Sequence, residues 1–189
     1  MICPRRRAVA AALVALLAHP LAAAQTAPDD PWSALRDGAI VLFRHAEAPG
    51  GGDPPGLRLD DCSTQRNLGI DGRAQARRIG AQFRAHRIAV AAVLASQWCR
   101  TRETAELAFP GRVRDDPDFN SFFGDAARAP AQTAAALATL TRWRGPGVLV
   151  VVTHQVNISA LTGVVPASGE GVIVRPQGER IEVVARLRP

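Results

Sequence analysis

The stretch AIVLFRHAEAP, residues 39–49, places two charged or titratable side chains directly at the end of an apolar run. The apolar residues at 40–43 are enough for a buried strand, and Arg44 and His45 follow with no spacer. A strand that is apolar on both faces is typical of a parallel sheet covered by helices on each side. Because ligands bind beyond the carboxyl ends of such strands, the end of this stretch is a candidate site.

Short apolar runs and helical stretches alternate along the rest of the chain. The GGGDPP run at 50–55 is expected to be a loop, and residues 111–130 show neither helical nor strand periodicity. We predict strands over 40–43, 90–95, 148–153, 171–174 and 181–185, and helices over 71–86, 100–108, 131–143 and 155–161. This order predicts a three-layer α/β/α fold with a mostly parallel central sheet.

The beginning of the chain has the pattern of a cleavable export signal. Three arginines at 5–7 precede an apolar stretch at 8–18, and the alanines at 22–24 fit an A-x-A cleavage site. The apolar stretch is too short to span a bilayer, which takes about 20 residues. We predict a signal peptide over 1–24, a flexible leader over 25–31 and a single domain over 32–189. The mature protein is then expected to be periplasmic or secreted, with no membrane span.

The charge balance does not indicate a nucleic-acid partner. All 23 basic residues are arginine, against 17 acidic residues. Removal of the three arginines at 5–7 leaves 20 against 17, a net charge of +3. The remaining arginines are scattered along the sequence rather than clustered, so we expect no nucleic acid among the partners.

Two cysteines remain once the signal is removed, Cys62 and Cys99. Export brings the chain into an oxidising compartment, where one disulfide between them is favoured over two independent thiols. Cys3 lies ahead of the apolar stretch and leaves with the signal.

Ionisable side chains follow two further predicted strands. Arg100 comes after the strand at 90–95, and His154 comes directly after the strand at 148–153. The carboxyl ends of parallel strands meet at one edge of a sheet, so these side chains are expected to join Arg44 and His45. The third histidine of the predicted mature chain, His86, ends a predicted helix and has no expected role.

Two arginines and two histidines at one place favour phosphoryl chemistry. Guanidinium groups bind phosphoryl oxygens bidentately, and a neutral imidazole can attack phosphorus and carry the phosphoryl group. Arginine beside a histidine repels a cation, and neither an HExxH nor a CxxC pattern occurs, so no metal and no cofactor is expected. A serine hydrolase is disfavoured because no G-x-S-x-G motif is present.

These segments together resemble the histidine phosphatase (phosphoglycerate-mutase-like) superfamily. The similar segments are FRHAE at 43–47, TQRNLGIDGRAQA at 64–76, SQWCRTRETA at 96–105 and VTHQVN at 152–157. They occur in the family's order and cover most of residues 40–163. The GEGVI segment at 169–173 and the final strands resemble a small exported bacterial subgroup.

The resemblance implies a role for each matching residue. His45 corresponds to the phosphorylated nucleophile, and Arg44 and Arg100 to the phosphate-binding arginines. His154 corresponds to the second histidine, which binds and stabilises the phosphoryl group. In this family the segment before the first helix folds over the site, so a Cys62–Cys99 bridge would tie that segment to the Arg100 loop.

The sequence departs from the family where many members carry a glutamate general acid. The corresponding stretch is DFNSFFG at 118–124, and Asn120 stands at the position of that glutamate. An asparagine amide cannot protonate a leaving alkoxide. The carboxylates that could act instead are Asp118, Asp125, Glu47 and Glu170.

Three functions are compatible with this pattern. The first is a metal-independent phosphatase that hydrolyses a small phosphomonoester through a phosphohistidine on His45. The second is a catalytically weak protein that binds phosphate or a phospho-sugar and lacks an efficient general acid, as Asn120 indicates. The third is a mutase, which would need a phosphorylated cofactor that is scarce outside the cell.

Overall fold

The apolar run that follows Ala39 forms strand β1 (Ile40–Arg44) in the interior of a six-stranded sheet. This computed structural model describes residues 30–36 and 38–189. The predicted signal peptide and most of the predicted leader lie outside the described residues. The other helices and strands are α1 (Ile70–Ala85), β2 (Val90–Ala95), α2 (Cys99–Ala108), β3 (Val113–Asp115), α3 (Ala129–Thr141), β4 (Val148–Thr153), α4 (Gln155–Thr162), β5 (Gly171–Gln177) and β6 (Arg180–Leu187).

The sheet has the strand order β3-β2-β4-β1-β5-β6. The neighbours β3, β2, β4 and β1 are parallel, and β5 and β6 are added antiparallel. The sheet is therefore mostly parallel, and the carboxyl ends of β2, β4 and β1 lie side by side.

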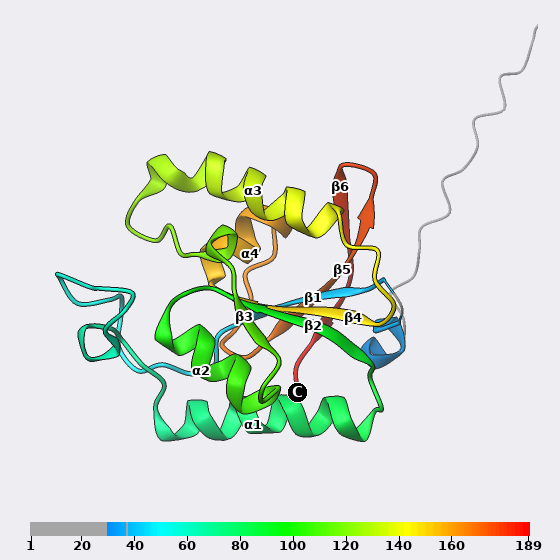
Figure 1. Cartoon of the computed structure of the whole chain (residues 1–189), viewed down its shortest axis with the longest axis horizontal. Coiled ribbons are helices and arrows are strands. Elements are labelled where there is room, and N and C mark those ends of the chain that lie inside the picture. Colours follow the sequence, from blue (N-terminus) through cyan, green and yellow to red (C-terminus); the bar gives the residue numbers. More distant parts are fainter. Residues whose placement is uncertain (1–29, 37) are drawn as a thin grey trace, which may run out of the picture.

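Helices cover both faces of the sheet (Figure 1), with α1 and α2 on one face and α3 and α4 on the other. Alternation along β1 explains why both faces are apolar. Val41 and Phe43 pack in one buried cluster with Phe83 of α1, whereas Ile40 and Leu42 pack in the other, which contains residues of α3 and α4. The predicted three-layer α/β/α architecture is confirmed.

The structure adds one strand to the predicted set. β3 lies within the stretch expected to be irregular, at the edge of the sheet, and pairs only with β2. Three residues are too few to show the alternation that identifies a strand in sequence. Short 3-10 helices occupy Pro31–Ala34 (η1), Cys62–Thr64 (η2), Pro117–Phe119 (η3) and Ala126–Arg128 (η4).

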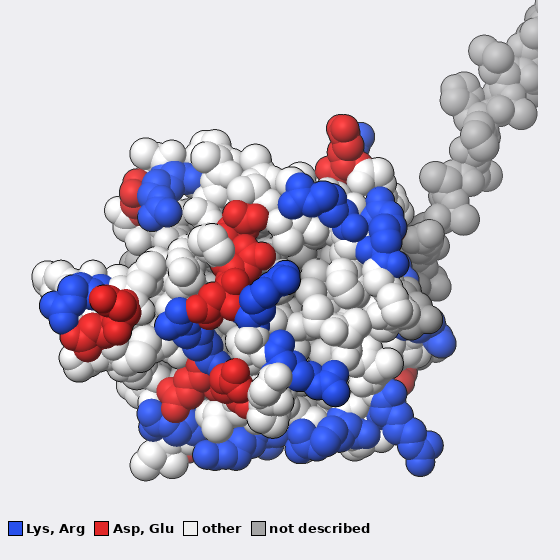
Figure 2. All heavy atoms as spheres, viewed as in Figure 1, with Lys and Arg blue, Asp and Glu red and all other residues white. Residues whose placement is uncertain are grey.

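Acidic and basic side chains are mixed on the face shown in Figure 2, with a row of basic residues along the edge where α1 lies. One of the arginines of α1, Arg73, pairs with Glu103 of α2. No helix in the described part of the chain has the length and apolar character needed to cross a membrane. The absence of a nucleic-acid partner stays a prediction.

Candidate active site

A cavity of about 220 Å³, open to solvent at one side, lies beyond the carboxyl ends of β1 and β4. The register pairs Arg44 of β1 with Thr153 of β4, so the next residues, His45 and His154, follow at the same level of the sheet. Their imidazole rings lie edge to face with centroids 5.6 Å apart. The structure thus brings together all four residues that the sequence indicated, because Arg44, His45, Arg100 and His154 line this cavity.

The ring of His45 is fixed by the backbone. Its Nδ1 lies 2.8 Å from the carbonyl oxygen of Ala46, which can only accept a hydrogen bond, so Nδ1 carries the proton. The N–H of Ala46 in turn donates to the Thr104 hydroxyl on α2 at 3.0 Å. Burial is the largest cause that lowers the pKa of His45, to about 3; the Ala46 carbonyl raises it, and the nearby arginines lower it further. The imidazole is therefore neutral at pH 7, with its lone pair on Nε2.

His154 is held by two polar contacts on opposite sides of its ring. Arg100 Nη2 lies 3.4 Å from Nδ1, and arginine has only donors, so Nδ1 accepts. Nε2 then carries the proton and donates to the Ser96 hydroxyl at 2.8 Å. Burial, followed by the charge of Arg100, holds the pKa of His154 well below its usual range. This histidine is also neutral in the free protein.

Three arginines, rather than the expected two, line the cavity. Arg66 joins Arg44 and Arg100 from the loop before α1. Arg66 donates to the backbone carbonyls of Ala48 and Gly50. The Nε atoms of all three arginines are buried and have no hydrogen-bond partner in the described part of the chain. Three guanidinium groups around one cavity indicate a site for an anion.

Arg66 lies in the segment at 64–76 that resembles the family, but the sequence pattern predicts no role for it. The signal that places Arg66 is the pair of cysteines. Arg66 lies shortly after Cys62, and Arg100 directly follows Cys99, so a bridge between the cysteines brings both arginines to one place.

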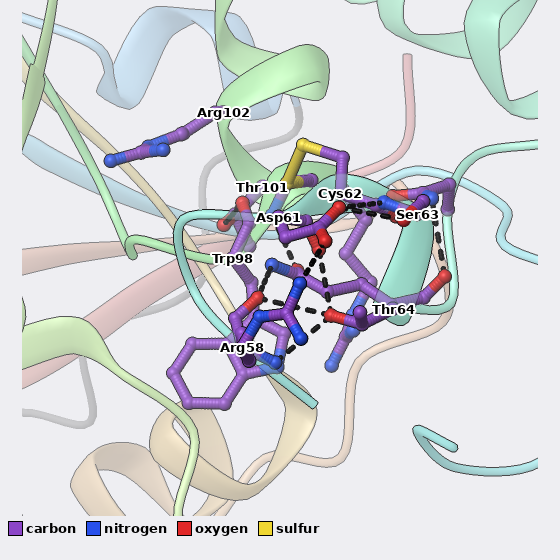
Figure 3. The surroundings of a disulfide bond; sticks show 12 residues. Arg58, Asp61, Cys62, Ser63, Thr64, Trp98, Thr101 and Arg102 are labelled. Atoms are coloured by element: carbon purple, nitrogen blue, oxygen red, sulfur yellow. Dashed lines mark hydrogen bonds and ion pairs between the residues drawn. A yellow bond between two sulfur atoms is a disulfide. The ribbon is translucent and has the colours of Figure 1, made fainter. Parts of the chain in front are cut away.

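The predicted disulfide between Cys62 and Cys99 is present, with an S–S distance of 1.99 Å. It joins the loop at 50–69 to the first turn of α2 (Figure 3). Gln65 strengthens the same junction, since its Oε1 accepts the N–H of Cys99 at 2.9 Å and its Nε2 donates to the Arg58 carbonyl at 2.8 Å. The loop is therefore fixed at the end that carries Arg66.

One carboxylate lines the cavity among the described residues, and it was not among the predicted candidates. Asp53 lies in the glycine-rich loop after β1 and faces the guanidinium of Arg100, with Nη1–Oδ1 at 2.6 Å and Nη2–Oδ2 at 3.0 Å. The indole N–H of Trp98 donates to the same carboxylate at 3.1 Å.

None of the four carboxylates proposed as general acids lines the cavity. Asp118 accepts a hydrogen bond from Thr139 on α3, and Asp125 is exposed. Glu47 is also exposed, and its backbone lies so close to α1 that a Cβ on Gly72 would be 1.9 Å from the Glu47 carbonyl oxygen.

Glu170 is buried but is fully engaged elsewhere. Its carboxylate pairs with Arg186 and Arg188 and accepts the N–H of Ala167. Burial alone would raise its pKa, but the hydrogen bonds from Arg186 and Ala167 lower the pKa to about 2. Glu170 is thus ionised and holds the C-terminal strand in place.

Asn120 lies behind the cavity rather than in it. Its Oδ1 accepts from the backbone N–H of Gln97 at 2.9 Å and from the Ser96 hydroxyl at 3.3 Å, and its Nδ2 donates to Gln97 Oε1. Because Ser96 contacts His154, Asn120 supports the orientation of that histidine. The amide is suited to this position, since it both donates and accepts.

The mouth of the cavity is partly apolar. Phe123 lines it with 72% of its surface exposed, together with Val156 and the glycines at 50–52. Phe119, from the same segment at 118–124, is fully buried in the core. Of these two phenylalanines, only Phe123 is therefore available to contact a ligand.

Comparison with solved structures identifies the fold. The chain is similar to the protein histidine phosphatase SixA complexed with tungstate, with 17% identity over 80% of this chain and 97% of that chain and a TM-score of 0.58. A phosphoserine phosphatase from Entamoeba histolytica, complexed with 3-phosphoglyceric acid, has 12% identity over 80% and 97% and a TM-score of 0.58. Phosphoglycerate mutase from Thermus thermophilus has 18% identity over 80% and 99% and a TM-score of 0.55.

The fold is thus that of the histidine phosphatase and phosphoglycerate-mutase-like proteins, as the sequence resemblance predicted. No protein-family model matches the sequence, and no curated protein matches it.

Proposed function

We propose that this protein is a metal-independent phosphatase that hydrolyses a small phosphomonoester through a phosphohistidine on His45. The observation that carries the proposal is a neutral histidine, with its Nε2 lone pair free, in a cavity lined by three arginines. The solved phosphatases of the same fold add support. Arg44, Arg66 and Arg100 repel a cation, which favours chemistry without a metal ion.

The proposed reaction begins with binding of the phosphoryl group by the arginines. Their donors fix the three non-bridging oxygens, and the fixed positive charge stabilises the transition state. The Nε2 lone pair of His45 attacks phosphorus, and the bond from phosphorus to the leaving oxygen breaks. The Ala46 carbonyl accepts from Nδ1–H and so stabilises the positive charge that the ring acquires.

We propose that His154 stabilises the phosphoryl group through Nδ1, the ring nitrogen that does not contact the Ser96 hydroxyl. Its Nδ1 faces Arg100 and is unprotonated in the free protein. A bound phosphate ester brings negative charge next to this ring, which favours uptake of a proton by Nδ1. The imidazolium then donates to a phosphoryl oxygen. Water attack on phosphorus completes the reaction and restores neutral His45.

We further propose that the protein acts after export, in the periplasm or outside the cell. The arginine-led apolar stretch at the start of the chain supports this, and the Cys62–Cys99 disulfide is compatible with an oxidising compartment.

Hydrolysis of p-nitrophenyl phosphate by the purified protein tests the proposal. We expect activity that persists in EDTA, is lost in His45→Ala and is kept in His86→Ala. His86 is a matched control because it is exposed and stacks on Trp32 with ring centroids 4.2 Å apart, outside the cavity. Full activity in His45→Ala would refute the mechanism. Orthophosphate binding without turnover of any ester would instead identify a phosphate-binding protein, and transfer of the phosphoryl group to a second alcohol would identify a mutase.

A further inference from the structure

Asp53 occupies the position in which a phosphoryl group would meet Arg100. Both outer nitrogens of that guanidinium bind the Asp53 carboxylate, in the paired geometry that arginine also uses for phosphate. The Arg100 side chain is only 4% exposed, so a phosphoryl group cannot bind these nitrogens from another, solvent-exposed side of the guanidinium. A phosphoryl group bound by these two nitrogens must therefore displace Asp53.

The loop that carries Asp53 is built so that it can move. Asp53 follows three consecutive glycines, and Gly50 and Gly52 adopt φ angles of +92° and +93°. Glycine occupies this region and its alternatives at little cost, so the segment before Asp53 can change conformation readily. The other end of the loop is fixed by the Cys62–Cys99 disulfide. The Asp53 carboxylate also accepts the backbone N–H of Arg66 at 3.3 Å, so its displacement from Arg100 has to break or rearrange this bond and the one from Trp98.

We propose that Asp53 is the proton donor to the leaving group and that, before substrate binds, it serves as an internal anion on Arg100. This inference rests on the proposed phosphatase function and assigns the general acid that the family position, Asn120, cannot supply. Asp53 is the one carboxylate among the described residues that lines the cavity. There it accepts a hydrogen bond from Trp98 and directly follows the glycines at 50–52, which also line the cavity.

When a phosphate ester replaces the Asp53 carboxylate on Arg100, Asp53 also acquires the protonated state that a proton donor needs. In the free protein, burial would raise the pKa of Asp53, but the hydrogen bonds and charge of Arg100 hold it below its ordinary value. Once an ester occupies Arg100, the carboxyl group loses that cation and faces the negative phosphoryl group. Both changes favour the protonated acid, which takes its proton from solvent.

Asp53 gives up a proton in the first step, phosphoryl transfer to His45, and regains one in the second, hydrolysis of the phosphohistidine. In the first, His45 Nε2 forms a bond to phosphorus, the electron pair of the breaking P–O bond moves to the leaving oxygen, and Asp53 gives that oxygen its proton. In the second, the Asp53 carboxylate takes a proton from the attacking water. The water oxygen bonds to phosphorus, and the electron pair of the P–N bond returns to His45. Asp53 is then protonated again, as it was when the ester had bound, and it returns this proton to solvent when phosphate leaves and the carboxylate pairs with Arg100 once more.

Two phosphate esters with different leaving groups separate proton donation from other roles. Phenolate is far more basic than p-nitrophenolate and depends much more on a proton donor. In Asp53→Asn we expect kcat/KM for phenyl phosphate to fall about 100-fold, but that for p-nitrophenyl phosphate to fall less than about 10-fold. Asp60→Asn is the control, because it removes an exposed carboxylate from the same loop outside the cavity. Equal losses for both esters, or no loss for either, would overturn the donor role.

Calorimetry with orthophosphate tests the internal anion separately. Asp53→Asn frees Arg100, so its Kd for orthophosphate should be about 10-fold lower than that of the wild type and of Asp60→Asn. An unchanged or higher Kd would overturn this part of the proposal. Binding also shows that the variant is folded. If the wild-type protein hydrolyses neither ester, the proposed phosphatase function fails, while the calorimetric result still decides whether Asp53 competes with phosphate.

Discussion

The rings of His45 and His154 meet edge to face, with centroids 5.6 Å apart, although the two residues lie far apart in the sequence. The parallel register of β1 and β4 causes this, because it pairs the two residues that precede them, Arg44 and Thr153. The fixed protons differ: His45 carries its proton on Nδ1 and His154 on Nε2. One ring therefore presents a lone pair for attack, and the other can gain a proton that contacts the phosphoryl group.

Arg100 is expected to bind the phosphoryl group through its two paired donors. Replacing it with lysine keeps the charge but removes the paired donors, and we expect kcat/KM for p-nitrophenyl phosphate to fall about 100-fold. Arg102→Lys is the matched control, because Arg102 lies on the same helix, pairs with Asp115 and is outside the cavity. Steady-state kinetics of the two variants measure this effect. Similar losses of kcat/KM in both would contradict a specific role of Arg100 in binding the phosphoryl group.

Ser96 is expected to act through His154. Ser96→Ala removes the acceptor for Nε2–H, which frees the ring to rotate or change tautomer. We expect kcat to fall about 10-fold or more with little change in KM, because binding by the arginines is intact. Ser63→Ala serves as the control, since that residue is exposed and its hydroxyl donates to Asp61 on the loop, away from the cavity. A large rise in KM with unchanged kcat would exclude this role.

The two buried histidines should make the fold sensitive to acid. The pKa of His45 is about 3 when folded and about 6.5 in an unfolded chain, so between these values the unfolded state binds more protons. The sign follows directly: the free energy of unfolding falls as pH decreases from 6.5 toward 3, by at most about 1.4 kcal/mol per pH unit for each such histidine.

Urea unfolding at pH 7, 6, 5 and 4 measures this dependence. The wild-type protein should lose stability more steeply than His45→Gln over this range, whatever the difference between them at pH 7. His86→Gln should follow the wild-type slope because His86 is exposed. Parallel curves for wild type and His45→Gln would contradict the assignment of a neutral, buried His45.

The disulfide is expected to stabilise both the fold and the site. The bridged cysteines are 37 residues apart, and in the chain-entropy model a loop of this length stabilises by about 3–4 kcal/mol. Reduction should lower the free energy of unfolding by up to this amount and raise KM, because Arg66 and Arg100 lie on the two joined segments. Intact mass after alkylation, with and without reductant, shows whether the bridge exists. Two alkylated cysteines without reductant would refute it.

The sequence was sufficient for the sheet and for four site residues because both depend on periodic features. Runs such as Val148–Thr153 are apolar on both faces, and the residue after each run lies at a known edge of a parallel sheet. Arg44, His45, Arg100 and His154 could therefore be predicted to lie together from the sequence.

Asp53 and Arg66 could not be found in that way. Both lie in the long loop between β1 and α1, whose path depends on glycine conformations and on the disulfide rather than on a repeating pattern. The four predicted acid candidates failed to reach the cavity for a related reason. The sequence does not show which way a carboxylate points, and burial and ion pairs direct side chains such as Glu170 elsewhere. β3 was missed because it is only three residues long.

The phosphohistidine itself is the most direct test of the account. The protein is mixed with p-nitrophenyl phosphate, quenched within milliseconds in alkali, where a phosphohistidine survives and a phosphoserine does not, and digested for mass spectrometry. We predict a phosphoryl group on the peptide that contains His45, labile in acid, present in His154→Ala and absent in His45→Ala. Turnover of the ester with no phosphoryl group on His45, or with the group on another residue, would contradict it.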